Sequence, residues 1–229
     1  MKRKFCSVLL IGLLGASAIS SQEVLGLLHE HIFYAYFSGT GRTPTDREID
    51  GFIETVRPQE FRNFRRNEFE WRRLRQEGIR QLTDGIANFN SDTLFVVLTN
   101  GEFGGYDFDR DGFEFRISNN FTFNATFGGR NERFTLLLTN NREFDLMEMD
   151  ADTANQLIQS RTLLGMVDRS VRLQIFFRFA DFAAPEFVEI IEGRRGYFIH
   201  GLIERIDVLD YRSPFDIGAP KIGEITRVQ

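Results

Sequence analysis

The sequence predicts an α+β protein, with a helical N-terminal part followed by a mainly antiparallel β-rich domain that carries one inserted helix. Before residue 90, apolar residues recur at the three-to-four-residue spacing of helices. After residue 90, they alternate with polar residues, and turn-forming residues separate the alternating runs. Strands joined by short turns indicate an antiparallel sheet, folded as a sandwich or an open barrel.

Residues 1–18 have the three-part pattern of a cleavable secretory signal peptide. A basic cluster at 2–4 precedes a short apolar run at 5–14, and the small residues A-S-A end at Ala18. The apolar run is too short to cross a bilayer, which needs roughly 20 residues. We expect cleavage after Ala18 and an exported protein, periplasmic or secreted, of bacterial appearance. A short membrane anchor is the alternative.

The composition of the mature chain excludes several kinds of chemistry. The single cysteine, Cys6, lies in the signal peptide, so the mature chain has no disulfide, thiol nucleophile or thiolate metal site. Packing must therefore hold the fold, and 25 phenylalanines supply apolar material for it. Removal of the three basic side chains at 2–4 changes the net charge from −5 to −8. This acidity argues against nucleic-acid binding, which requires positive charge to neutralise phosphates.

A helical, arginine-rich segment is expected over residues 19–89. Residues 23–37 are strongly apolar at helical spacing, and a glycine-rich break follows them. Thr45 and Glu48 match the capping-box pattern, in which each residue's side chain accepts a hydrogen bond from the other's backbone. We therefore predict that a second helix begins there.

A further helix is expected after Pro58, because proline is tolerated in a first helical turn. It should continue over residues 59–82, with an interruption near Gly78, since glycine lowers helix stability.

The β-rich domain is expected over residues 90–212. A helix at 151–164, ended by Gly165, should interrupt the series of strands. Residues 213–229 contain two prolines and two glycines and are expected to form an irregular tail. The predicted strands lie at 92–99, 106–108, 113–117, 121–127, 134–138, 171–179, 187–191 and 196–209.

The arginine-rich part of the helical segment is the first candidate binding site. Residues 57–80 hold eight arginines and four glutamates, a local net charge of +4 in an acidic protein. Such a face could dock an acidic protein, a glycan or a lipid surface. The alternative is a solvated helix face with Glu–Arg pairs, or a helix that covers the protein's own acidic sheet. The candidate binding residues are Arg62, Arg65, Arg66, Trp71, Arg72 and Arg73.

A run of alternating aspartates is the candidate metal site. Asp107, Asp109, Asp111 and Gly112 match the first half of a calcium-binding loop, but Ser118 stands where the closing glutamate belongs. We favour a hairpin without metal, in which the aromatic residues at 106 and 108 face the core and residues 109–112 turn the chain. A calcium-stabilised β domain is the alternative, and calcium is the one cofactor considered.

No catalytic motif stands out along the chain. His29 and His31 are two residues apart, which places them on different sides of a helix, unlike a metal-binding pair at a spacing of four. The leading hypothesis is an exported, non-catalytic module for binding or envelope assembly. The second is an envelope hydrolase that uses paired carboxylates, with His200 as an optional further group; a deep pocket lined by two convergent carboxylates would favour it.

Overall fold

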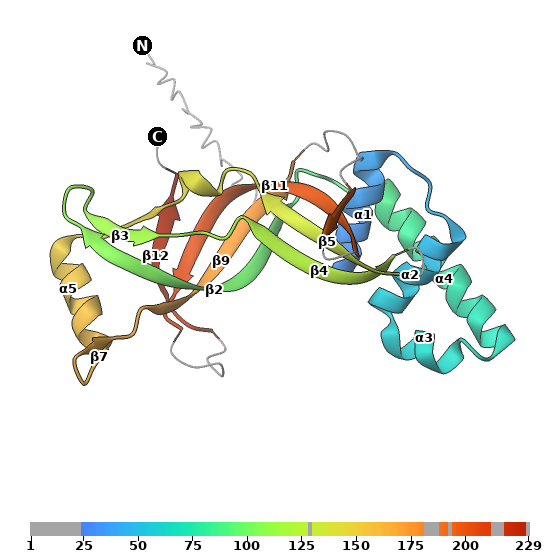
Figure 1. Cartoon of the computed structure of the whole chain (residues 1–229), viewed down its shortest axis with the longest axis horizontal. Helices are drawn as coiled ribbons and strands as arrows, with labels where there is room; N and C mark the ends of the chain where they lie inside the picture. Colours follow the sequence, from blue (N-terminus) through green and yellow to red (C-terminus); the bar gives the residue numbers. More distant parts are fainter. Residues whose placement is uncertain (1–23, 128–129, 181–187, 192–193, 212–217, 228–229) are drawn as a thin grey trace, which may run out of the picture.

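The computed structural model describes residues 24–127, 130–180, 188–191, 194–211 and 218–227. The predicted signal peptide lies outside these residues. The predicted α+β class is confirmed. Figure 1 shows an elongated molecule in which four helices gather at one end and most of the strands form the other. One more helix, the predicted insertion, lies at the far end of the β-rich part.

The N-terminal segment begins as a strand and then becomes helical. Residues 24–26 pair in parallel with the first long strand, Val24 opposite Leu94, so the helix predicted from residue 23 begins only at His29. The elements are β1 (Val24–Gly26), α1 (His29–Thr40), α2 (Asp46–Val56), α3 (Pro58–Phe64) and α4 (Glu68–Ala87).

The predicted capping box at the start of α2 is confirmed. Glu48 Oε2 accepts hydrogen bonds from Thr45 N at 2.8 Å and from Thr45 Oγ1 at 2.9 Å. The other oxygen of this buried carboxylate accepts a hydrogen bond from the Arg42 guanidinium, which also lies over the Phe37 ring. Glu48 therefore ties the loop before α2 to the helix.

The helix break lies at residues 65–67 and not at Gly78, where it was predicted. Asn67 caps α4, because its Oδ1 accepts from the backbone N of Phe69 at 3.1 Å and of Glu70 at 3.3 Å. Gly78 lies inside α4, where a Cβ would approach Ile53 Cγ1 of α2 to 2.4 Å. The glycine is thus required for close helix packing and does not end the helix.

Six of the described strands form a closed antiparallel barrel. Its order is β2–β3–β6–β12–β11–β9, and β9 pairs again with β2 to close the ring. This confirms the β-rich domain and selects a barrel over a sandwich. The strands are β2 (Leu94–Asp107), β3 (Gly112–Phe115), β6 (Leu146–Glu148), β9 (Ser170–Phe179), β11 (Arg194–Leu209) and β12 (Lys221–Thr226).

Strand β12 corrects the prediction of an irregular tail from residue 213. It closes the barrel between β11 and β6, and its Ile225 is fully buried opposite Ile206 and Met147. A Cβ on Gly223 would come within 2.3 Å of Met147 Sδ. The glycine that suggested an irregular tail is therefore needed where the strand meets the barrel interior.

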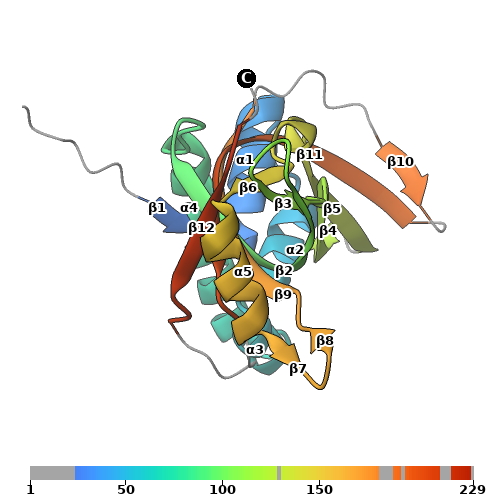
Figure 2. The ribbon, with the colours of Figure 1, turned by 90° about the vertical axis from the view of Figure 1, so that its left-hand side faces the viewer.

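The inserted helix is also shorter than predicted. Helix α5 (Ala151–Ser160) ends four residues before the predicted boundary, and a small hairpin follows it, formed by β7 (Thr162–Leu163) and β8 (Met166–Val167). Gly165 lies in the turn of this hairpin with φ 81°. Figure 2 shows the hairpin extending beyond α5, away from the barrel.

A lateral sheet extends from the barrel along the N-terminal half of β11. There β11 pairs in parallel with β5, from Gly196 opposite Arg133 to Gly201 opposite Leu138. Helices α1 and α2 cover this sheet. Its other strands are β4 (Asn120–Phe127), β5 (Arg130–Leu138) and β10 (Val188–Ile191), and a short 3-10 helix spans Asn141–Glu143.

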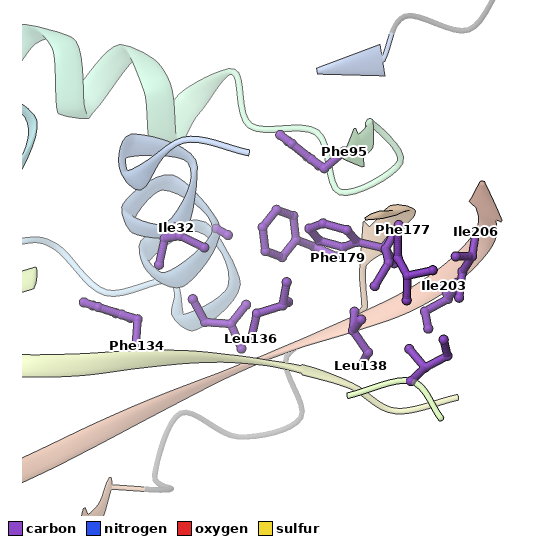
Figure 3. Close-up of a cluster of buried hydrophobic side chains, with 14 of the residues drawn as sticks. Ile32, Phe95, Phe134, Leu136, Leu138, Phe177, Phe179, Ile203 and Ile206 are labelled. Atoms are coloured by element: carbon purple, nitrogen blue, oxygen red, sulfur yellow. The ribbon is translucent and has the colours of Figure 1, made fainter. Parts of the chain in front are cut away.

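One continuous apolar core joins the helices, the lateral sheet and the barrel. On the helical side, the Phe134 ring lies 5.5 Å from Phe33 and 5.5 Å from Tyr36, centre to centre. On the barrel side, Phe95 lies 5.0 Å from Phe179. Figure 3 shows Phe134, Phe95 and Phe179 in one cluster with Ile32 of α1. The helical part therefore packs on the sheet as part of the same folding unit.

Replacing Glu48 with alanine should lower the free energy of unfolding by about 1–3 kcal/mol, because the capping box is lost together with the hydrogen bonds that Glu48 accepts from Thr45 and Arg42. Urea denaturation measures this change. Glu54→Ala, which removes a carboxylate of the same helix that makes no ion pair among the described residues, is the control. An equal loss in both variants would contradict the role of the cap.

Acid should destabilise the fold through His31 at the N-terminus of α1. Its Nδ1 accepts a hydrogen bond from Leu28 N at 3.1 Å, and burial lowers the pKa of His31 below 6.5, with Glu30 opposing the shift. The unfolded chain therefore takes up this proton first, so the contribution is complete above about pH 7.5 and is lost as the pH falls below 6.5. The melting temperature, measured from pH 8 to pH 5, should fall less steeply in His31→Gln than in the natural chain. An unchanged slope would contradict the role of His31.

Candidate functional site

The exposed arginines of α3 and α4 form a single surface, which we call the basic face. Helix α4 buries Leu74, Gly78 and Leu82 against the neighbouring helices. Residues on its opposite side, at a spacing of three and four, are exposed. Together with the corner between α3 and α4, this side presents Arg62, Arg65, Arg66, Phe69, Arg72, Arg73 and Arg80.

Two other arginines of the same segment have a structural role. Arg57 Nη1 lies 3.1 Å from Glu77 Oε2 and so joins α3 to α4. Arg75 lies 2.9 Å from Asp50 and 2.6 Å from Asp46, and so joins α4 to α2. These contacts join different helices and do not belong to the basic face. The Glu–Arg pairs at a spacing of three, which the alternative expects, are Arg57 with Glu60 at 3.8 Å and Arg73 with Glu70 at 2.9 Å.

Most guanidinium groups of the basic face have no carboxylate partner. Arg73 Nη2 pairs with Glu70 Oε2 at 2.9 Å, and Arg65 lies over the Phe61 ring at 5.3 Å. Among the residues that the structure describes, the rest make no ion pair: these are Arg62, Arg66, Arg72 and Arg80. Their positive charge is available to an acidic ligand.

The aromatic residue of the basic face is Phe69 and not Trp71, which was predicted as a binding residue. Trp71 is half-buried, and its ring packs edge-on against Phe61 at 5.5 Å. Phe69 is 84% exposed at the corner where α4 begins. The partial burial of Trp71 could have been predicted from helical spacing, because Trp71 lies three residues before buried Leu74 and therefore on the same side of α4.

The predicted β2–β3 hairpin is confirmed, but Phe108 does not face the core. Tyr106 pairs with Phe113 and Asp107 with Gly112, so residues 108–111 form the turn. Phe108 is 79% exposed at its tip.

The aspartates of this turn do not gather as metal ligands. Asp107 Oδ1 accepts hydrogen bonds from the backbone N of Asp109 at 2.9 Å and of Arg110 at 3.2 Å. Asp111 adopts a left-handed conformation with φ 49°. In the described part of the chain, no three acidic or histidine side chains lie together as a possible metal site. The carboxylate of Asp107 thus closes a turn.

The barrel surface carries a groove of about 970 Å³ along β2, β3 and β9. Glu102, Glu114 and Asp145 contribute carboxylates to its lining, and Asp145 is held by a two-point contact with Arg110 at 2.8 and 3.2 Å. His200, the histidine of the hydrolase alternative, lies on β11 and is not part of this lining. His200 is therefore not brought to these carboxylates.

Comparison with known proteins gives a family and no function. A family model described as a domain of unknown function (DUF4852) matches residues 45–160, just over half of the chain. No curated protein and no solved structure matches the chain. The matched region begins at the cap of α2 and ends at the last residue of α5, so it includes the whole basic face. Within the described residues, no helix combines the length and apolar character needed to cross a bilayer.

Asp107→Ala should lower the free energy of unfolding by about 1 kcal/mol, because the turn loses two hydrogen bonds to its backbone. Asp107→Asn should retain most of the stability, since the amide oxygen accepts the same bonds. Melting curves in calcium and in chelator should coincide for the natural chain. A calcium-dependent rise in melting temperature that disappears in Asp109→Ala would contradict this assignment of the turn.

Proposed function

The chain belongs to the DUF4852 family, and we propose that it is an exported, non-catalytic binding module whose basic face docks an acidic protein surface. The observation that carries the proposal is the charge of this face. Its six arginines outnumber the exposed carboxylates of the same helices, which are Glu60, Glu68 and Asp84, although the chain as a whole has a net charge of −5. An excess of positive charge on one surface attracts a partner of the opposite sign.

Arginine and phenylalanine together favour a protein partner. The planar guanidinium binds carboxylates through two parallel hydrogen bonds. Aromatic and arginine residues are enriched at the centres of protein interfaces, where they contribute much of the binding energy. Phe69 supplies an exposed apolar surface beside Arg66 and Arg72, whereas a polyanionic glycan would need only the charges.

The position of the basic face suits docking. Helices α3 and α4 lie at the end of the molecule opposite α5, and the N-terminal half of α4 extends away from the barrel (Figure 1). The helices beneath it are fixed by the Arg57 and Arg75 ion pairs and by the close packing at Gly78. A partner would therefore meet a rigid surface and pay little ordering entropy in the protein.

Reversing the charges of Arg62, Arg66 and Arg72 to glutamate should weaken partner binding at least tenfold, because three attractions become repulsions. Proteins retained by the full chain from the envelope fraction of its source are quantified by mass spectrometry. Calorimetry with the purified partner then measures affinity, which should fall between 0.05 and 0.5 M salt as charges are screened.

The matched control reverses Arg47, Arg116 and Arg142, which are also exposed and make no ion pair among the described residues, but lie outside the basic face. The control has the same net charge and should bind normally. Equal loss in both variants would show a nonspecific charge effect and refute the proposal. Retention on heparin that depends on the basic face, with no retained protein partner, would instead identify a glycan ligand.

A further inference from the structure

The hairpin after α5 presents apolar side chains to solvent at its tip. Strands β7 and β8 pair through Thr162 opposite Val167 and Leu163 opposite Met166, which leaves a two-residue turn. Leu163 is 75% exposed, Leu164 91% and Met166 73%. Three neighbouring large apolar residues at one projecting tip form an apolar patch, unlike the scattered exposed residues that are normal on a protein surface.

Leu164 is unfavourable for the stability of the hairpin. It adopts φ 51° and Gly165 adopts φ 81°, the pair of positive φ angles that a type I′ two-residue hairpin turn requires. Asparagine or glycine takes the first of these positions readily, whereas a leucine pays a steric cost there. Because its side chain is almost fully exposed, no packing contact offsets this unfavourable steric energy. Residues that hold an unfavourable backbone conformation without compensating contacts cluster at functional sites.

The base of the hairpin is held rigidly by a buried arginine. Arg161 Nη1 donates to Ser170 O at 2.7 Å and to Asp168 O at 3.2 Å, and its other terminal nitrogen pairs with Asp210. Asp168 N in turn donates to Arg161 O at 2.9 Å. The hairpin is therefore anchored to β9 and to the end of β11, and its tip has a defined direction.

The tip itself carries no exposed charge. In the range 155–167 the one charged residue is Arg161, whose side chain is buried. Exposed acidic residues lie on both sides of this range, at Asp152 and Asp168. A negatively charged surface would thus be repelled, while an uncharged apolar environment could accept the tip without desolvating any ion.

We propose that the β7–β8 tip inserts into the interfacial region of a zwitterionic lipid bilayer. Two features favour lipid over protein. A four-residue tip falls well short of the roughly 20–30 residues that each partner of a stable protein complex contributes. A bilayer accepts a convex apolar tip without a shaped groove. The site is independent of the basic face, which lies at the opposite end of the molecule (Figure 1).

The test is flotation of the exported protein, from which the predicted signal peptide has been removed, with phosphatidylcholine vesicles. Binding should be reversible and insensitive to 0.5 M salt. Because the basic face can itself attract anionic headgroups, the effect of anionic lipid is measured in the Arg62, Arg66 and Arg72 reversal variant, whose binding should weaken when anionic lipid is added. Leu164→Asn should lower the partition coefficient about tenfold, because one apolar side chain no longer leaves water. The same variant should melt at an equal or higher temperature, since Asn-Gly is the favoured sequence for this turn. If vesicle binding is lost while the melting temperature is unchanged or higher, Leu164 acts in binding and not in stabilising the fold.

Leu98→Asn, which changes an exposed leucine on the barrel, is the matched control and should bind vesicles normally. Reversal of Arg62, Arg66 and Arg72 should also leave vesicle binding unchanged, so failure of the basic-face proposal is separately visible. The inference is overturned if the natural chain does not float at millimolar lipid, if Leu164→Asn binds as well as the natural chain, or if binding requires anionic lipid. Capture of a protein through this tip without vesicle binding also overturns it.

Discussion

Strand β11 changes partners halfway along its length, and the arrangement of the whole molecule follows from that change. Up to Gly201 it pairs with β5 of the lateral sheet, and from Gly201 onward it pairs with β9 of the barrel. A Cβ at Gly201 would lie 3.0 Å from Phe177, 3.1 Å from Leu138 and 3.2 Å from Leu136, which belong to the strands on both sides. The shared strand joins the helical end and the barrel end in one framework. One continuous apolar core packs between its elements.

This framework fixes two unrelated surfaces at opposite ends of the molecule. The aromatic contacts of α1 with Phe134 and Tyr197 hold the helical end on the lateral sheet, and α4 packs outside α1 and α2. At the other end, Arg161 fixes the β7–β8 hairpin to the barrel. If both proposals hold, the chain is a rigid spacer that keeps a protein-binding face at a distance from a lipid surface.

Local patterns predicted the α+β class, the capping box of Glu48 and most strands, because each depends on residues close in sequence. Longer-range contacts decided the remaining features. Gly78 suggested a helix break, but a glycine is needed there because Ile53 occupies the neighbouring space. Gly223 suggested an irregular tail, but a glycine is needed there because Met147 lies against it. The basic face could be predicted from composition alone. Composition could not predict which arginines lack a carboxylate partner, or whether Phe69 or Trp71 is exposed. Both depend on where α3 ends and on the ion pairs that α4 makes with the neighbouring helices.

The place of β12 in the barrel also sets the order in which the chain can fold. The ring is closed by contacts between residues far apart in sequence, with Thr226 opposite Leu146 and Phe95 opposite Phe177. Closing such long loops is entropically costly and slow. During synthesis the barrel cannot close until residues 221–226 have left the ribosome, so its ring of strands stays open until then. A late closure of this kind would keep the polypeptide competent for translocation in an unfolded state, as the proposed export requires.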